Sequence, residues 1–294
     1  MKFLLSPLIL FLYSSVLFAQ TSLQYNLKQG EVFTVKQDAV QIITQELEGA
    51  AHEITNVING ILEFKVVALA KDSYEIELRF KDLNLSMTSS IQGELMNVKA
   101  SEVIEGDMQS KIFNSLLNSP VMLTLARTGD ILQVIGGDSL VSKMADASGI
   151  EDEFSLNLMK KSLEKEFGSE ALSNSYKQMT YIYPDEPVSV GSTWENSYTG
   201  KLNTKNSWAL DEITAAQAMI SGKAEVVMDI KEPATTMLLN GTQQTKITAN
   251  LDSGFIQKME VEGLSEGFST ITQLGEQEIP TKIKSTITYE LIEE

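Results

Sequence analysis

Two short motifs carry residue types that could perform nucleophilic chemistry. The first is Gly137-Asp138-Ser139-Leu140, which matches the nucleophile motif of one class of lipases and esterases. A serine nucleophile needs a base that takes its proton as it attacks. In that class the base is a histidine three residues after an aspartate, whereas this sequence has one histidine, His52, and no Asp-x-x-His. We therefore interpret Asp138 as the cap of a short helix, worth about 1 kcal/mol, and Ser139 as the first helical residue.

The second motif, Ser162-Leu163-Glu164-Lys165, has the Ser-x-x-Lys spacing of penicillin-recognising enzymes. Those enzymes also use a Ser-Asp-Asn element and a Lys-Thr-Gly strand, and neither string occurs in the sequence. Ser162 and Lys165 lie between the apolar positions of an amphipathic helix. This pattern indicates a solvated helix face.

Metal and cofactor motifs are equally incomplete. The chain has no cysteine, which excludes thiolate metal sites and thiol catalysis, and His52 alone cannot form a zinc site. The acidic stretch 102–107 lacks the Asp-x-Asp-x-Asp-Gly spacing of a calcium loop. No lysine follows Gly136-Gly137 at the spacing of a phosphate-binding loop. We expect no catalytic, metal-binding or cofactor-binding residue and no cofactor.

The elements around these motifs are mostly strands. Tyr74, Ile76, Leu78 and Phe80 alternate with charged residues, and residues 282–291 alternate in the same way. Clean alternation is typical of antiparallel strands with one buried face and one solvated face. The predicted fold class is therefore mainly β (α+β), with long antiparallel strands in one or two curved sheets.

Helical spacing appears in the middle of the chain. Apolar residues three to four apart predict a short helix near 107–118 and a longer one over 151–167, which Gly168 ends. The apolar stripe of the longer helix comprises Phe154, Leu158, Met159, Leu163 and Phe167. A further helix is expected over 169–179.

The resulting organisation has four parts. Residues 1–19 are expected to be a signal peptide and 20–137 an N-terminal β-rich half that contains the short helix near 107–118. Residues 138–182 are a helical insert, and 183–294 are a C-terminal β-rich half. The turn at 125–131 resembles the turn at 250–256, and Gly30–Phe33 resembles Gly191–Trp194, which suggests an internal duplication.

The first residues suggest export. Lys2 precedes an apolar run over 3–18, and Ala19 offers a small-residue cleavage site. The run is interrupted by serine and proline and is too short for a typical membrane span, so we expect no transmembrane span after cleavage. The formal net charge of −17 opposes binding to nucleic-acid phosphates and anionic lipid. We exclude nucleic acid and expect an exported protein, either periplasmic or at the cell surface or outside the cell.

The 12 methionines are the remaining signal for a binding surface. Methionine adapts to varied apolar partners, so these side chains could line a groove for lipid or apolar peptide. The alternative, which we favour, is that they fill the core. The residues concerned include Met87, Met96, Met219, Met228, Met237 and Met259.

The order of segments resembles a family of secreted Bacteroidetes proteins known only as a domain of unknown function. The segments are residues 25–33, 125–137, 166–170, 183–184 and 187–194. The resemblance implies a β-rich fold and an envelope or exported location. It implies no catalytic residues.

Three functions remain open. The first is an exported, non-enzymatic envelope protein that binds an apolar ligand or another envelope component. The second is a hydrolase that uses carboxylates or Ser139, since carboxylate pairs need no histidine. The third is a structural interaction module that pairs through its strand edges.

Overall fold

The computed structural model describes residues 20–292 except Glu48, Asn118, Lys201, Pro233 and Glu276. The signal peptide predicted over 1–19 lies outside the described residues. No helix in the described part of the chain is long and apolar enough to cross a membrane.

The N-terminal half of the chain forms six strands and one helix. They are β1 (Val32–Leu47), β2 (Ala50–Leu69), β3 (Ser73–Ser89), β4 (Gly93–Lys99), α1 (Met108–Leu116), β5 (Val121–Ala126) and β6 (Ile131–Ile135). Three helices follow: α2 (Gly137–Asp146), α3 (Glu153–Phe167) and α4 (Ser169–Thr180). The C-terminal half contains β7 (Thr193–Tyr198), β8 (Leu202–Ile213), β9 (Gln217–Lys231), β10 (Thr235–Asn250), β11 (Ile256–Ile271), a 3-10 turn (Thr272–Leu274) and β12 (Ile279–Ile292).

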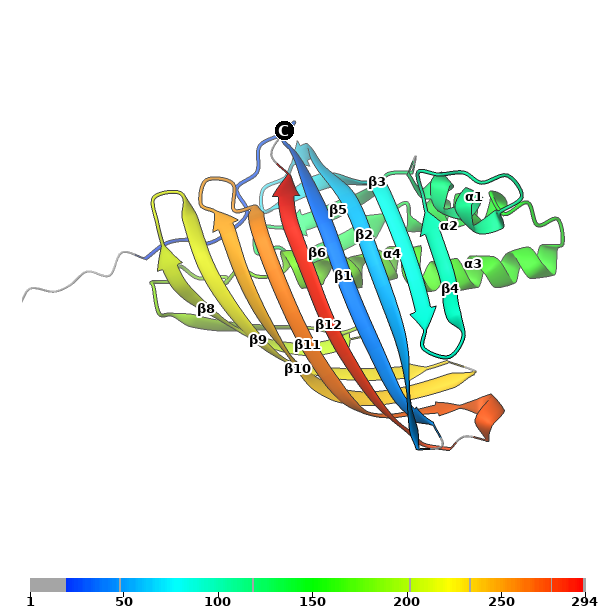
Figure 1. Ribbon diagram of the computed structural model, residues 1–294. Helices are drawn as coiled ribbons and strands as arrows, with labels where there is room; N and C mark the ends of the chain where they lie inside the picture. The colour runs from blue at the N-terminus through cyan, green and yellow to red at the C-terminus, as the bar shows by residue number, and fades with distance from the viewer. Residues whose placement is uncertain are drawn as a thin grey trace, which may run out of the picture.

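All these strands belong to one antiparallel sheet. Its order is β6-β5-β3-β2-β1-β12-β11-β10-β9-β8-β7, with β4 paired to β3 beside this path. The first strand of the chain pairs with the last, so β1 and β12 join the two halves at the middle of the sheet (Figure 1). The prediction of a mainly β fold with long antiparallel strands is confirmed, and one sheet is present rather than two. One edge is β7, and the other is formed by β6 and by β4, which pairs only with β3 among the described strands; pairing through those edges stays a prediction.

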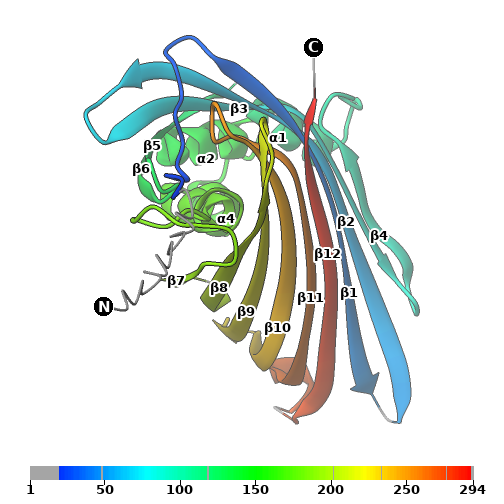
Figure 2. The same ribbon diagram turned by 90° about the vertical axis from the view of Figure 1, so that its left-hand side faces the viewer.

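The sheet is strongly curved, and α2 and α4 lie inside the curve (Figure 2). Alternation along each strand decides which side chains face them. Tyr74, Ile76, Leu78 and Phe80 of β3 are buried on the concave face, as predicted, while Arg79 is exposed on the convex face. Burial of these apolar side chains supplies the driving force that holds the helices against the sheet.

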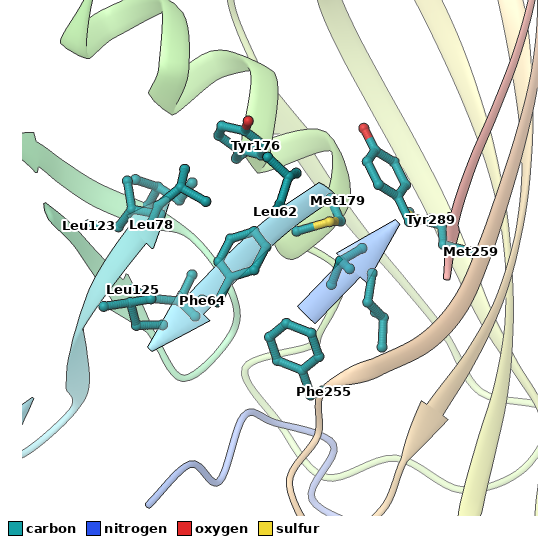
Figure 3. Packing of buried hydrophobic residues seen from close by; sticks show 14 of the residues in the cluster. Leu62, Phe64, Leu78, Leu123, Leu125, Tyr176, Met179, Phe255, Met259 and Tyr289 are labelled. Carbon is teal, nitrogen blue, oxygen red and sulfur yellow. The ribbon is translucent and has the colours of Figure 1, made fainter. Parts of the chain in front are cut away.

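The core lies between α4 and the concave face. Leu172, Tyr176 and Met179 form the buried side of α4, and Phe64 of β2 packs edge-on against the Tyr176 ring (Figure 3). These helical residues recur at three-to-four spacing, which places them on one side of the helix. α1 confirms the helix predicted near 107–118, and α2, α3 and α4 confirm the predicted helical insert.

Helix α3 differs from the prediction. Its expected apolar stripe packs only in part, because no residue of α3 is fully buried, and Phe154 and Leu158 are 72% and 53% exposed. The helix begins at Glu153, two residues after the predicted start, because Asp152 is its N-cap and accepts a hydrogen bond from the Ser155 amide. Hydrogen bonding from the Ser155 side chain, and then from its amide, lowers the pKa of Asp152.

Two glycine turns connect the halves through short backbone hydrogen bonds. The Tyr25 amide donates to the Arg127 carbonyl in the β5–β6 turn, and the Asn26 amide donates to the Ser253 carbonyl in the β10–β11 turn. The Tyr183 hydroxyl also donates to the Gly254 carbonyl. The turns at 125–131 and 250–256, which resemble each other in sequence, thus both bind the N-terminal segment at Tyr25 and Asn26. The duplication itself stays a prediction.

Candidate ligand-binding cavity

Ser139 lies in the first turn of α2 and is exposed. The predicted cap is wrong: Gly136 occupies the N-cap position with φ of 100°, and no side chain caps the helix. Asp138 is instead a residue of the first turn, where its negative charge is favourable near the positive end of the helix dipole. The helix starts earlier than predicted because Gly136 adopts the left-handed conformation that turns the chain out of β6.

His52 lies on β2, and its hydrogen bond is made with another serine. Its Nε2 is 3.0 Å from the Ser89 hydroxyl, which also accepts hydrogen bonds from the Ile91 and Gln92 amides in the turn after β3. The Nδ1 atom of His52 is buried and has no hydrogen-bond partner among the described residues. The carboxylate that orients the base in a catalytic triad is therefore missing from this pair.

The other sequence motifs also lie apart from one another. Ser162 and Lys165 are exposed on α3, and Lys165 forms an ion pair with Glu232 in the β9–β10 turn. No group of three or more His, Asp or Glu side chains that could hold a metal ion occurs within the described ranges.

The structure contains a large cavity between α3–α4 and the concave face of the sheet. Its volume is about 1090 Å³, at the upper end of the roughly 300–1,000 Å³ typical of small-molecule sites. Residues of β1, β8, β9, β10 and β12 form one wall, and residues of α2, α3 and α4 form the other.

The sheet wall of this cavity is apolar. Apart from Gln41 of β1, it consists of apolar side chains that face each other across paired strands: Ile43–Ile283, Ile230–Met237 and Leu202–Met228. Between β10 and β12, strand β11 presents only Gly263, Ser265 and Gly267 at the corresponding concave positions. A Cβ atom at Gly267 would lie 2.2 Å from the Leu238 carbonyl oxygen. The small residues therefore permit close backbone approach in a strongly bent part of the sheet.

Methionine has both of the roles considered from the sequence. Met228 and Met237 line the cavity, whereas Met259 is buried in the core. Met219 faces the convex side and is partly exposed.

The helical wall is polar. Ala171, Asn174, Ser175 and Gln178 of α4 face the cavity, and their spacing of three and four residues places them on one side of the helix. This side lies opposite the apolar residues that α4 buries in the core. Helix α4 therefore separates the core from the cavity and gives the cavity an uncharged polar wall.

Charged residues occupy the rim near the α3–α4 junction. Asp138, Glu164 and Glu170 line this part of the cavity together with Lys161 and Lys165. Because these groups border the apolar wall, a bound molecule would meet both apolar and polar surfaces.

A second, smaller void lies further along the concave face. Its volume is about 10 Å³, and Gln178 lines both it and the large cavity. No lining residue is charged: the set is Gln178, Tyr198, Asn206, Trp208, Gln243, Thr245, Val261, Ile287 and Tyr289. Tyr289 is buried beside α4 (Figure 3), and burial raises the pKa of its hydroxyl well above the usual value. The hydroxyl is therefore neutral at physiological pH.

Sequence reasoning identified Met228 and Met237 but missed Tyr289, Gln178 and Gln243. A local signal for this end of the site does exist on β10. Its concave positions change from apolar at Met237 to glycine at 241 and then to an amide at Gln243. This change within one strand face marks where the apolar wall gives way to a polar one.

The fold and the site define a class of protein with a single curved antiparallel sheet and helices on its concave face, which together enclose a cavity with one apolar wall. The chain belongs to the family described as "Family of unknown function (DUF6263)", whose sequence model matches residues 71–256. The predicted resemblance to a domain of unknown function is thus confirmed; Bacteroidetes origin and secretion stay predictions. No curated protein matches the sequence.

One solved structure shares the fold over most of the chain. It is lipovitellin, from a study titled "Lipid-protein interactions in lipovitellin", with 12% identity and a TM-score of 0.52. The alignment covers 91% of this chain and 26% of lipovitellin, so the chain spans about a quarter of that protein's length.

Other matches have lower scores. DynF from the dynemicin biosynthesis pathway of Micromonospora chersina is 6% identical with a TM-score of 0.26, over 91% of this chain and 83% of DynF. An outer-membrane channel of Pseudomonas putida F1 is 8% identical with a TM-score of 0.28, over 91% of this chain and 97% of the channel.

Proposed function

We propose that this protein is an exported, non-enzymatic envelope protein that binds an apolar or amphiphilic molecule between α3–α4 and the concave face of the sheet. The observation that carries the proposal is the apolar wall of the large cavity, formed by Ile43, Ile283, Met228, Met237 and neighbouring residues. Each methylene group that leaves water for such a surface contributes about 0.8 kcal/mol. The apolar run and cleavage site predicted at the start of the chain support export.

The uncharged polar residues of α4 support an amphiphile rather than a pure hydrocarbon. Asn174, Ser175 and Gln178 line the wall that faces the apolar floor. A hydrocarbon that filled the whole cavity would remove these groups from water without replacing their hydrogen bonds, which costs free energy. A molecule with an apolar side and a polar side satisfies both walls.

Binding is tested first on the native protein purified from its own envelope. Native mass spectrometry before and after solvent extraction is expected to show a lipid-sized mass that extraction removes. The extracted protein is then expected to bind the apolar fluorophore N-phenyl-1-naphthylamine. If no molecule co-purifies and the fluorophore does not bind, the proposal is wrong.

Met228→Trp is expected to weaken fluorophore binding at least about tenfold, because the larger side chain fills the space beside Leu202 in the cavity. The matched control is Val227→Trp, whose side chain lies on the opposite, convex face of β9 and is exposed. Fluorescence titration of both variants measures the effect. Equal affinities for the two variants would place the binding site elsewhere.

A further inference from the structure

The small void at the inner end of the cavity is surrounded by polar groups without partners. Tyr289 is 5% exposed, and its hydroxyl makes no hydrogen bond with any described residue. The side-chain amides of Gln178 and Gln243 are half buried and likewise form no hydrogen bond within the described part of the chain. Buried polar groups in proteins are nearly always hydrogen-bonded. The hydroxyl of the almost fully buried Tyr289 side chain, which lines the void together with the half-buried Gln178 and Gln243 amides, therefore indicates a partner that enters from the cavity.

The void continues the large cavity along the same strands. On β10 the concave face runs from Met237 in the cavity to Gln243 at the void, and on β12 it runs from Ile283 to Tyr289. Between these positions the concave face carries the small residues Gly241, Gly263 and Ser285, flanked by Leu239 of β10 and Ile287 of β12. Gln178 of α4 lines both spaces from the opposite wall.

The chemistry of the void selects the kind of group that fits. A void of about 10 Å³ is close to the roughly 10–15 Å³ that one water-sized oxygen needs. None of its lining residues is charged, and an ionised group buried without a counter-charge is strongly unfavourable. A hydroxyl or carbonyl oxygen meets both conditions, because a tyrosine hydroxyl and a glutamine amide can each donate to it.

We propose that Tyr289, Gln178 and Gln243 form an anchor for one uncharged oxygen of a neutral amphiphile, whose apolar chain then lies along Ile283 and Met237. The ligand class is therefore a long-chain alcohol or ester rather than an ionised fatty acid. This inference rests on the proposed function of the cavity and names the substrate class of that same site.

The test uses compounds with the same ten-carbon chain and different head groups. Decanol, methyl decanoate, decanoate and decyltrimethylammonium each compete with N-phenyl-1-naphthylamine, which contains no oxygen, at pH 8. Decanol and methyl decanoate are expected to displace the fluorophore at lower concentrations than either charged compound. Tighter binding of decanoate than of decanol would refute the anchor.

Tyr289→Phe removes only the hydroxyl. Decanol affinity is expected to fall about two- to tenfold, the range that one hydrogen bond provides, while the affinity for the fluorophore stays unchanged. The matched control is Tyr74→Phe, which removes a hydroxyl that donates to the Tyr25 carbonyl outside the cavity and should leave decanol binding unchanged. Thermal unfolding of both variants verifies that they are folded.

The outcomes separate the two proposals. If neither the fluorophore nor any ten-carbon compound binds, the proposed function fails. If all compounds bind equally and Tyr289→Phe has no effect, the void holds only a water molecule and the anchor is refuted, while apolar binding stands.

Discussion

Phe64→Ala is expected to lower the free energy of unfolding by about 3–5 kcal/mol, the range for deleting a buried phenylalanine ring. Phe64 is 2% exposed, and its ring contacts Tyr176 of α4 and Phe255 after the β10–β11 turn. The substitution leaves a cavity where the helix meets the sheet, and the lost contacts come from both halves of the chain. Urea denaturation followed by circular dichroism measures the loss.

The matched control is Phe268→Ala. Phe268 is 51% exposed on the convex face of β11, so the same chemical change removes little buried surface. Its effect is expected to stay within about 0.5 kcal/mol, as for most surface substitutions. Comparable losses in the two variants would contradict the assignment of the core to the concave face.

Gly129→Ala is expected to cost about 2–5 kcal/mol, the sum of the left-handed backbone penalty and local overpacking. Gly129 has φ of 92°, and a Cβ atom there would lie 1.7 Å from the carbonyl oxygen of Thr180. Because the Thr180 carbonyl belongs to the backbone and cannot rotate away as a side chain could, the whole β5–β6 turn would have to move away from the end of α4. Denaturant unfolding measures the change.

Gly149→Ala separates the two contributions. Gly149 has φ of 72°, and nothing lies within 4 Å of the position of its Cβ atom, so only the conformational penalty of about 1–2 kcal/mol applies. The difference between the two variants is the cost of the clash. If Gly129→Ala is no worse than Gly149→Ala, the turn is not held against α4.

Much of the fold was predictable because its signals are local. The alternation at 74–80 specifies a strand with one buried face, and the three-to-four spacing in 151–167 specifies a helix. The cap at Asp138 was predicted wrongly because aspartate is a preferred cap in general, whereas here the left-handed Gly136 sets the helix start. Helix α3 forms as its three-to-four spacing predicts, but no other described element packs over Phe154, which stays exposed.

The cavity was not predictable in the same way. Its apolar wall brings Ile43 together with Ile283, and Leu202 with Met228, through strand register. Alternation shows which residues share a face within one strand, but not which residues of distant strands lie opposite each other. The three polar residues at the void come from α4, β10 and β12, and no sequence motif links them.

The pairing of β1 with β12 has a consequence for how the protein is made. Ile43 and Ile283 meet across that pair, so the apolar wall cannot close until the last strand has left the ribosome. Contacts between such distant segments also form slowly, because a long loop must close before they are gained. The wall between β1 and β12 therefore stays open until β12 has been made, which suits the export proposed above. On this view, the proposed ligand is captured only after β12 has paired with β1.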